Sequence, residues 1–142
     1  MTEPDTLTRV MEEMIPFNRF LGLRVTHVER GFVRVLVPFR EELVGDFMRP
    51  ALHGGVIASL TDVAGGFAVW THVDNERGRV STIDMRVDYL RPGRLTTLVA
   101  EARVVRAGKR VGVADVRAYH PDAEDVTVAT GKGVYNISIP KT

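Results

Sequence analysis

Most of the chain shows short, regular patterns of hydrophobic and polar residues, but one long stretch does not. That stretch, LHGGVIASLTDVAGGFAVW, runs from Leu52 to Trp70 and contains a single formally charged residue, Asp62. A helix over Gly54–Trp70 would be apolar on nearly every side, which is typical of a helix buried inside a protein. Its many Gly and Ala residues would let other backbones come close, and the pair Gly65-Gly66 predicts a bend or a loosened turn.

The rest of the chain predicts one short helix and six strands. An amphipathic helix over Leu7–Met14 ends before Pro16 and belongs to a helical N-terminal segment, residues 1–17. The strands alternate in polarity, are rich in β-branched residues and are separated by turn residues such as Arg91-Pro92-Gly93. The expected strands span Leu23–Val28, Phe32–Val37, Val80–Leu90, Leu95–Arg106, Val111–His120 and Val126–Ile139.

These elements predict an α+β fold in a single domain, residues 1–142, with an antiparallel sheet curled around one central helix. Small residues recur on one face of the later strands, for example at Gly112 and Ala114, and match the small residues of the helix. Residues 38–50 are expected to form a loop that can hold one helical turn. Such a sheet has free edges, and a long edge strand favours pairing with a second copy of the chain.

Composition and charge exclude several classes of function. The formal net charge is +1 and the Lys and Arg residues are scattered, so no nucleic-acid partner is expected. The chain has no Cys, and its histidines lack metal-ligand spacing, so neither a cysteine nucleophile nor a metal site is expected. The polar, acidic N-terminus is unlike a signal peptide, and Asp62 disfavours a membrane span. We therefore expect a cytoplasmic protein without membrane contact.

The start of the predicted central helix resembles a known family. His53-Gly54-Gly55, followed by Asp62 nine residues after the histidine, resembles the central-helix motif of the hotdog-fold acyl-CoA thioesterases. The resemblance is to the branch that includes the phenylacetate-pathway thioesterase. The stretch STIDMRVDYLRPG, residues 81–93, resembles the strand that follows the helix in this branch. The order of elements agrees over almost the whole chain, and the resemblance therefore implies the hotdog fold.

The resemblance also implies an activity, the hydrolysis of an acyl-CoA thioester without a cofactor. Asp62 is then the nucleophile or the general base. The N–H of Gly54 would polarise the thioester carbonyl, because the first N–H groups of a helix lack intrahelical partners and carry the positive end of its dipole. The resemblance further implies that His53 holds the loop at the helix start or touches the thioester oxygen, and that Thr82 positions the water or the acid. By strict alternation, however, Thr82 faces away from Met85.

Five other residues are candidates for substrate contact. The branch commonly has a polar residue six positions before the histidine, but Phe47 stands there, with Asp46 beside it. Asp46 or a backbone group is expected to take over that role. Arg91 and Arg110 lie near strand ends and suit the phosphates of coenzyme A. The fifth candidate is Gly55, because glycine lets a ligand approach the backbone.

Helix geometry predicts how many chains build one site. Gly54 and Asp62 are eight residues apart, which places them about 12 Å apart along a helix axis. That distance is too long for both to act on one thioester, whereas two chains related by a two-fold axis could pair Gly54 of one with Asp62 of the other. The resemblance implies the same arrangement, a homodimer with two shared sites that often pairs into a homotetramer.

Several alternatives stay open. Asp62 could be a structural acid paired with an arginine on a strand. The protein could bind acyl-CoA without hydrolysing it, and an acyl carrier protein could replace coenzyme A. A hotdog hydratase or dehydratase is a further alternative, and Asp115 and His120 have the spacing of its Asp/His pair. A separation of five on a strand, however, places these two side chains on opposite faces.

Overall fold

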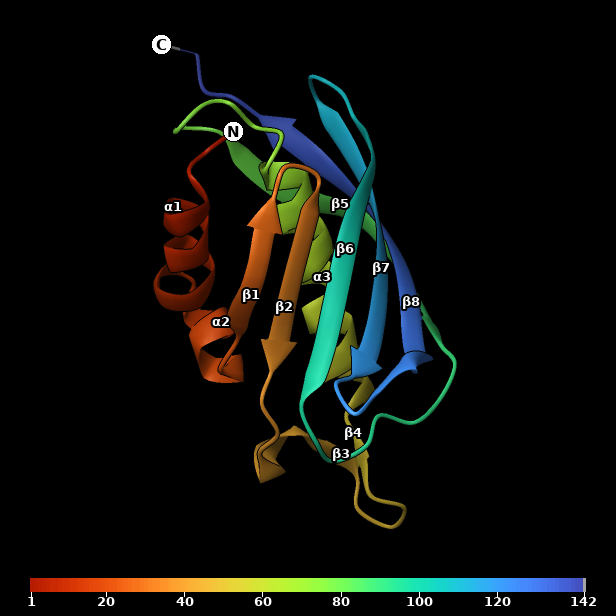
Figure 1. Cartoon of the computed structure of the whole chain (residues 1–142). Coiled ribbons are helices and arrows are strands. Elements are labelled where there is room, and N and C mark those ends of the chain that lie inside the picture. Colours follow the sequence, from red (N-terminus) through yellow and green to blue (C-terminus); the bar gives the residue numbers. More distant parts are fainter. Residues whose placement is uncertain (142) are drawn as a thin grey trace.

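The computed structural model describes residues 1–141, and its main feature is a six-stranded antiparallel sheet wrapped around one long helix, α3 (Gly54–Trp70) (Figure 1). The strand order is β1-β2-β6-β7-β8-β5, so β1 and β5 are the edges of the sheet. This arrangement confirms the predicted α+β hotdog fold. The strands span β1 Arg24–Glu29, β2 Phe32–Val37, β5 Arg79–Tyr89, β6 Leu98–Ala107, β7 Val111–His120 and β8 Ala123–Ser138.

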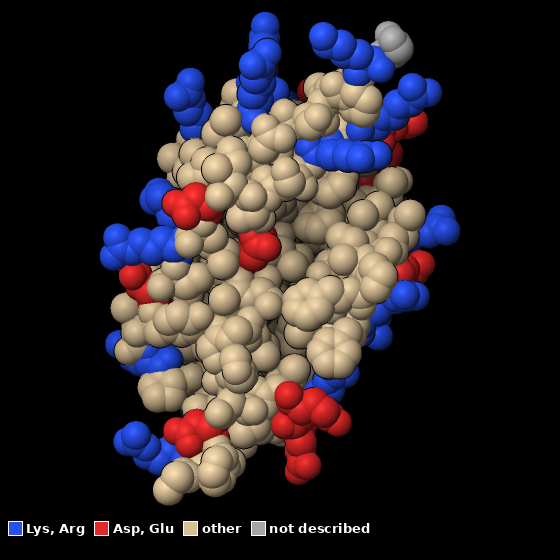
Figure 2. Space-filling view, turned by 180° about the vertical axis from the view of Figure 1, so that it is seen from behind, with Lys and Arg blue, Asp and Glu red and all other residues tan. Residues whose placement is uncertain are grey.

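The face of the molecule on the side of α3 differs from its margins in charge. Figure 2 shows that this face is hollowed in its middle and that Lys and Arg side chains gather around its periphery. Within residues 1–141, no helix is both long enough and apolar enough to cross a membrane. The long apolar stretch noted in the sequence is the helix that the sheet encloses.

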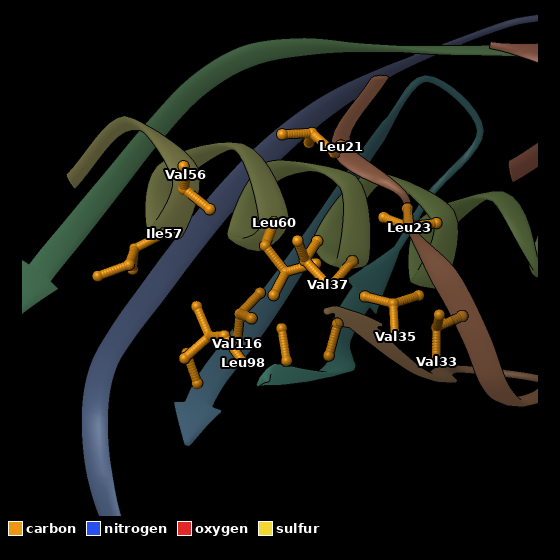
Figure 3. Packing of buried hydrophobic residues seen from close by; sticks show 14 of the residues in the cluster. Leu21, Leu23, Val33, Val35, Val37, Val56, Ile57, Leu60, Leu98 and Val116 are labelled. Carbon is orange, nitrogen blue, oxygen red and sulfur yellow. The ribbon is translucent and has the colours of Figure 1, made fainter. Parts of the chain in front are cut away.

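The hydrophobic core lies between α3 and the concave face of the sheet (Figure 3). Leu60 of α3 is fully buried there, and burying one leucine side chain contributes about 1.5–3 kcal/mol. Alanines on the facing strands, including Ala100 and Ala114, are also fully buried, and their small size lets the helix lie close to the sheet. The side chains that meet in this layer include Val56, Ile57, Leu60, Val35, Val37, Leu98 and Val116.

Helix α3 runs without interruption through Gly65 and Gly66, so this pair does not break the helix. The two glycines instead make room for Tyr135 of β8. A Cβ atom on Gly65 would lie 2.3 Å from the Tyr135 hydroxyl oxygen, and one on Gly133 would lie equally close. The close fit of the aromatic ring against the helix explains why glycine stands at positions where a better helix former would be expected.

The N-terminal helical segment is longer than predicted. Helix α1 (Pro4–Arg9) continues into a π-helical turn at Val10–Met14, and α2 spans Pro16–Leu21. The prediction ended the segment at residue 17 because Pro16 stops the preceding helix. Proline also fits the first position of a new helix, where no N–H is needed, and Gly22 ends α2 in the left-handed conformation with φ 72°.

Two regions between the main strands differ from the expectation. The expected loop at residues 38–50 holds one 3₁₀ turn and also part of a missed strand pair, β3 (Val44–Asp46) with β4 (Ala51–Leu52). Strand β6 begins at Leu98 rather than Leu95 because His120 holds the preceding segment. The His120 ring bonds to the Thr97 carbonyl through Nδ1 and accepts the Arg94 N–H at Nε2.

Candidate active site

Asp62 of α3 and Thr82 of β5 lie in direct contact. The Thr82 hydroxyl donates a hydrogen bond of 2.8 Å to Asp62 Oδ1. Among residues 1–141, Asp62 Oδ2 has no hydrogen-bond partner, and no Lys or Arg pairs with this carboxylate. A partly buried carboxylate without a cation costs stability. The structural ion pair considered above is therefore absent, and one carboxylate oxygen is free to meet a ligand.

A β-bulge at Ile83 brings Thr82 to the inner face of the sheet. The register of β5 against β8 shifts by one residue there, so that Thr82 opposes Tyr135 and Met85 opposes Gly133. Thr82 and Met85 therefore both point toward α3, while Ile83 is exposed. The expectation that Thr82 faces away from Met85 was wrong, because the extra residue inverts the alternation of a regular strand.

Tyr135 supports the helix turn that carries Asp62. Its hydroxyl donates a hydrogen bond of 3.1 Å to the backbone carbonyl of Asp62. Burial, together with the negative charge of Asp62, raises the pKa of Tyr135 far above its ordinary value, so the hydroxyl stays protonated as a donor. The sequence interpretation missed this residue. The available signal was a large aromatic side chain that directly follows the small residues Ala129, Gly131 and Gly133 on one face of β8.

His53 caps the N-terminus of α3 and leaves one donor free. Its Nδ1 accepts the N–H of Gly55 at 2.8 Å, and its carbonyl accepts the N–H of Val56 at 2.9 Å. Within the described part of the chain, the Gly54 N–H has no acceptor. The Tyr89 hydroxyl donates to the Gly54 carbonyl at 2.8 Å. The free N–H of Gly54 thus lies at the positive end of the helix dipole, where it can bind a carbonyl oxygen that gains negative charge.

Asp46 is the last residue of β3, and Phe47 begins the connection to β4. The Asp46 side chain accepts the N–H groups of Met48 and Arg49 at 2.9 and 3.0 Å, so it stabilises its own loop. Phe47 is 87% exposed. Neither residue lines the cavity beside Asp62 of the same chain, and both lie toward the Gly54 end of α3 (Figure 1).

The two candidate arginines are far apart in one chain. Arg91 donates to the carbonyl of Thr127 and borders a shallow hollow that Gly54 and Tyr89 also line. Arg110 lies at the turn between β6 and β7, at the other end of the sheet (Figure 1). Arg91 is therefore near the start of α3, and Arg110 is near its end.

A cavity of about 250 Å³ opens beside Asp62, between α3, β5 and the N-terminal helices. Asn18 of α2 lines it as well; this side chain is 2% exposed and donates its amide N–H to the Met11 carbonyl at 3.0 Å. The sequence interpretation missed Asn18, and its place in a turn-like segment gave no signal. The lining combines four polar residues with an apolar remainder, as small-molecule sites commonly do.

A larger groove lies on the outer face of the sheet, and four of its five charged side chains pair with one another. Lys132 bonds to Asp115 at 2.6 Å, and Arg86 bonds to Asp88 at 3.1 Å. Surface ion pairs of this kind are ordinary solvated charges. The cavity beside Asp62 is the better candidate for an active site.

Comparison with known proteins agrees with the fold. The model of the thioesterase superfamily matches residues 46–127, and this chain belongs to that superfamily. The chain is 40% identical over 128 residues to "Medium/long-chain acyl-CoA thioesterase YigI" of Salmonella typhimurium. The matched region covers 82% of this chain and 83% of the relative. The predicted resemblance and the enzyme class, thioester hydrolase, are confirmed.

Solved structures resemble the chain over nearly its whole length. A protein of Shewanella oneidensis related to the thioesterase superfamily has a TM-score of 0.85 and 31% sequence identity, over 94% of both chains. The PaaI protein from the phenylacetic acid degradation operon of E. coli has a TM-score of 0.81 and 26% identity, covering 96% of this chain and 94% of that one. The hotdog fold is thus shared with thioesterase structures.

Proposed function

We propose that this protein hydrolyses an acyl-CoA thioester to a free acid and coenzyme A, in the cytoplasm. The observation that carries this proposal is the Asp62 carboxylate, which Thr82 holds through one oxygen beside a largely apolar cavity. The apolar lining suits an acyl group. Similarity to a relative named as an acyl-CoA thioesterase supports coenzyme A, rather than an acyl carrier protein, as the thiol.

The proposed reaction uses two groups of the protein. Asp62 Oδ2 either attacks the thioester carbonyl carbon or takes a proton from a water molecule that attacks it. In both routes the carbonyl oxygen becomes negative and accepts the Gly54 N–H, and the carbon–sulfur bond then breaks to release the thiolate of coenzyme A. In the first route, water hydrolyses the mixed anhydride and restores the carboxylate. Thr82 holds Oδ1, so that Oδ2 is presented to the substrate.

We propose that each site combines residues of two chains. Within one chain, Gly54 and Asp62 lie about 12 Å apart along α3, so a two-fold pairing of chains is needed to bring both to one thioester. Strand β5 is a free edge of the sheet and offers unpaired backbone groups to a second copy. The middle of the face that contains the hollow is free of Lys and Arg (Figure 2). We infer a homodimer with two sites, and two dimers can pair into a homotetramer.

The alternative functions have less support from the geometry. A hydratase needs Asp115 and His120 together, but Asp115 is exposed and bonds to Lys132, whereas His120 is buried and bonds to backbone groups. A protein that only binds acyl-CoA has no use for a carboxylate without a cation at the cavity. Hydrolysis is the function that uses Asp62, Thr82 and the Gly54 N–H together.

The test is release of free thiol from a panel of acyl-CoA thioesters by the wild-type protein and by Asp62→Asn, which keeps the shape of the side chain. We expect turnover by the wild type and a loss of at least about a hundredfold in the variant, as for a lost acid/base group. Asp125→Asn, an exposed carboxylate on β8, is the matched control and should stay active. Circular dichroism and gel filtration verify folding and assembly. An inert wild type, or an equally active Asp62→Asn, contradicts the proposal.

A further inference from the structure

Trp70, the last residue of α3 and the only tryptophan in the sequence, separates two hollows of the molecule. On one side it lines the cavity that contains Asp62. On the other side it lines a groove of about 550 Å³ between the N-terminal helix α1 and residues 74–76. Its indole ring stacks on Phe67, with ring centroids 5.1 Å apart and ring planes inclined by 14°. The stacking holds the indole between the two hollows.

The lining of the Asp62 cavity changes along the axis of α3. The polar end holds Asp62, Thr82 and Tyr135, which are joined by hydrogen bonds. Apart from Asn18, whose amide donates to the Met11 carbonyl, the rest of the lining is apolar. A ligand that fits this cavity has a reactive polar group at one end and an apolar tail at the other. The apolar lining residues are Ile15, Phe17, Val63, Phe67, Trp70 and Val80.

We propose that this cavity holds the acyl chain of the substrate and that Trp70 is its end wall, which limits the chain to about ten carbons. The proposal rests on the thioesterase activity proposed above. Trp70 follows Asp62 by eight residues, or about 12 Å along the helix. An extended chain advances roughly 1.2 Å per backbone atom, so about ten carbons span this distance.

The cavity volume gives a similar limit. At roughly 30 Å³ for each water-sized group, which is close to the size of a methylene, the cavity of about 250 Å³ holds about eight groups. Longer acyl chains would have to displace the indole to reach the groove under α1. Trp70 is thus a specificity-determining residue, which leaves the chemistry at Asp62 unchanged.

The first test measures kcat/KM for straight-chain acyl-CoA substrates from four to sixteen carbons. Up to a length of about ten carbons, each added methylene should raise kcat/KM by as much as about fourfold. The values for fourteen and sixteen carbons should then lie at least about tenfold below the maximum. Trp70→Ala joins the cavity to the groove, so the ratio of kcat/KM for the sixteen-carbon substrate to kcat/KM for hexanoyl-CoA should rise at least about tenfold over the wild-type ratio. Trp70→Phe keeps most of the wall and should stay close to the wild type. Equal chain-length profiles for the wild type and Trp70→Ala overturn the proposal.

The second test does not depend on turnover or on a variant that folds. Because Trp70 is the only tryptophan, its fluorescence reports directly on the end of the cavity. S-alkyl-coenzyme A thioethers cannot be hydrolysed, and we expect the decyl compound to shift the emission to shorter wavelength, while the butyl compound and coenzyme A itself do not. If the emission shift is absent, or is equal for all alkyl lengths, the proposal that Trp70 is the end wall of the cavity is overturned.

The two experiments separate the two proposals. Turnover of acyl-CoA without a length-dependent fluorescence shift overturns the role of Trp70 and leaves the thioesterase activity standing. A length-dependent shift without turnover of any substrate supports the acyl cavity and contradicts the activity. A shift together with a changed profile in Trp70→Ala supports both.

Discussion

The Thr82 hydroxyl reaches Asp62 Oδ1 at 2.8 Å because strand β5 carries one extra residue, Ile83, relative to its neighbour β8. Without this bulge, a regular strand would place Thr82 and Met85 on opposite faces. The β-bulge therefore produces the contact between Thr82 and Asp62 on which the candidate site depends. The bulge brings a hydroxyl donor to the carboxylate and keeps the side chains further along the strand packed against α3.

The hydrogen bond between Thr82 and Asp62 can be removed without changing the shape of the site. Thr82→Val replaces the hydroxyl by a methyl group, and a hydrogen bond to a charged group is worth about 1.5–3 kcal/mol. We expect kcat to fall about ten- to a hundredfold with little change in KM, because the positioning of the carboxylate is lost. Thr82→Ser keeps the donor and should restore most of the rate. A Thr82→Val enzyme at the wild-type rate would show that the hydrogen bond has no part in catalysis.

The N–H of Gly54 can be removed while the helix is kept. Gly54 is the first helical residue of α3, and proline is tolerated there. The preceding His53 has φ −59° and ψ 132°, an extended conformation that a following proline accepts. We expect Gly54→Pro to lower kcat about 10²- to 10³-fold, as for the loss of an oxyanion donor.

Gly54→Ala is the matched control, because it keeps the N–H. The added Cβ would lie 3.4 Å from the Tyr89 ring, which is an ordinary contact, so this variant should retain activity. Circular dichroism must show that both variants keep the helix. Equal losses in the alanine and proline variants would mean that space at the helix start, rather than the N–H, is required.

The fit of Tyr135 against α3 predicts an unusual effect of alanine. In an exposed helix, Gly→Ala gains about 1 kcal/mol, but Gly65→Ala places a Cβ 2.3 Å from the Tyr135 hydroxyl. We expect the free energy of unfolding to fall by about 1–3 kcal/mol, as for an overpacked core, measured by urea denaturation. Tyr135→Phe removes the clashing oxygen, so Gly65→Ala should cost less in that background, with a coupling of about 1 kcal/mol or more. Additive losses would disprove the steric explanation.

Glu101 on the outer face of the sheet predicts a pH dependence of stability. Burial alone would raise its pKa, but hydrogen bonds from Tyr119 at 2.7 Å and Arg34 at 3.0 Å outweigh burial and lower it. The Glu101 carboxylate therefore binds a proton more readily in the unfolded chain than in the folded chain. The stabilisation is complete above the unfolded pKa, near 4.5, and is lost as the pH falls through the lower folded pKa.

Glu101→Gln tests this dependence, because glutamine does not ionise. We expect the variant to be less stable than the wild type at pH 7 and the difference to shrink between about pH 5 and pH 3. The measurement is the free energy of unfolding from urea titrations across this range. If the difference in free energy of unfolding between the wild type and the variant stays constant down to pH 3, the ionised Glu101 is ruled out as a source of stability.

The sequence predicted the parts of this structure that follow from residue type and spacing. The apolar stretch around Asp62 predicted α3, and alternating segments predicted the long strands within a few residues. The bulge at Ile83 was not predictable from these patterns, because the extra residue leaves no mark on the local alternation. Tyr135 and Asn18 reach the site only through tertiary packing, across 73 residues in the case of Tyr135.

Some expectations failed because one residue type can serve two purposes. Pro16 ends one helix and begins the next, and the sequence interpretation used only the first role. Gly65 and Gly66 weaken helix propensity, yet they accommodate the Tyr135 ring. In both cases local propensity allows two structural roles for the residue, and tertiary packing determines which role it takes.

The most direct test of the central claim, a site shared by Asp62 of one chain and the Gly54 N–H of another, is complementation between two inactive variants. Asp62→Asn and Gly54→Pro are coexpressed, and the rate of thioester hydrolysis is compared with that of each variant alone. A mixed dimer contains one site with both groups intact, so random pairing should restore about a quarter of the wild-type rate. If the mixture stays as inactive as the separate variants, although mixed dimers are present, the two groups do not act across the interface and the shared site is contradicted.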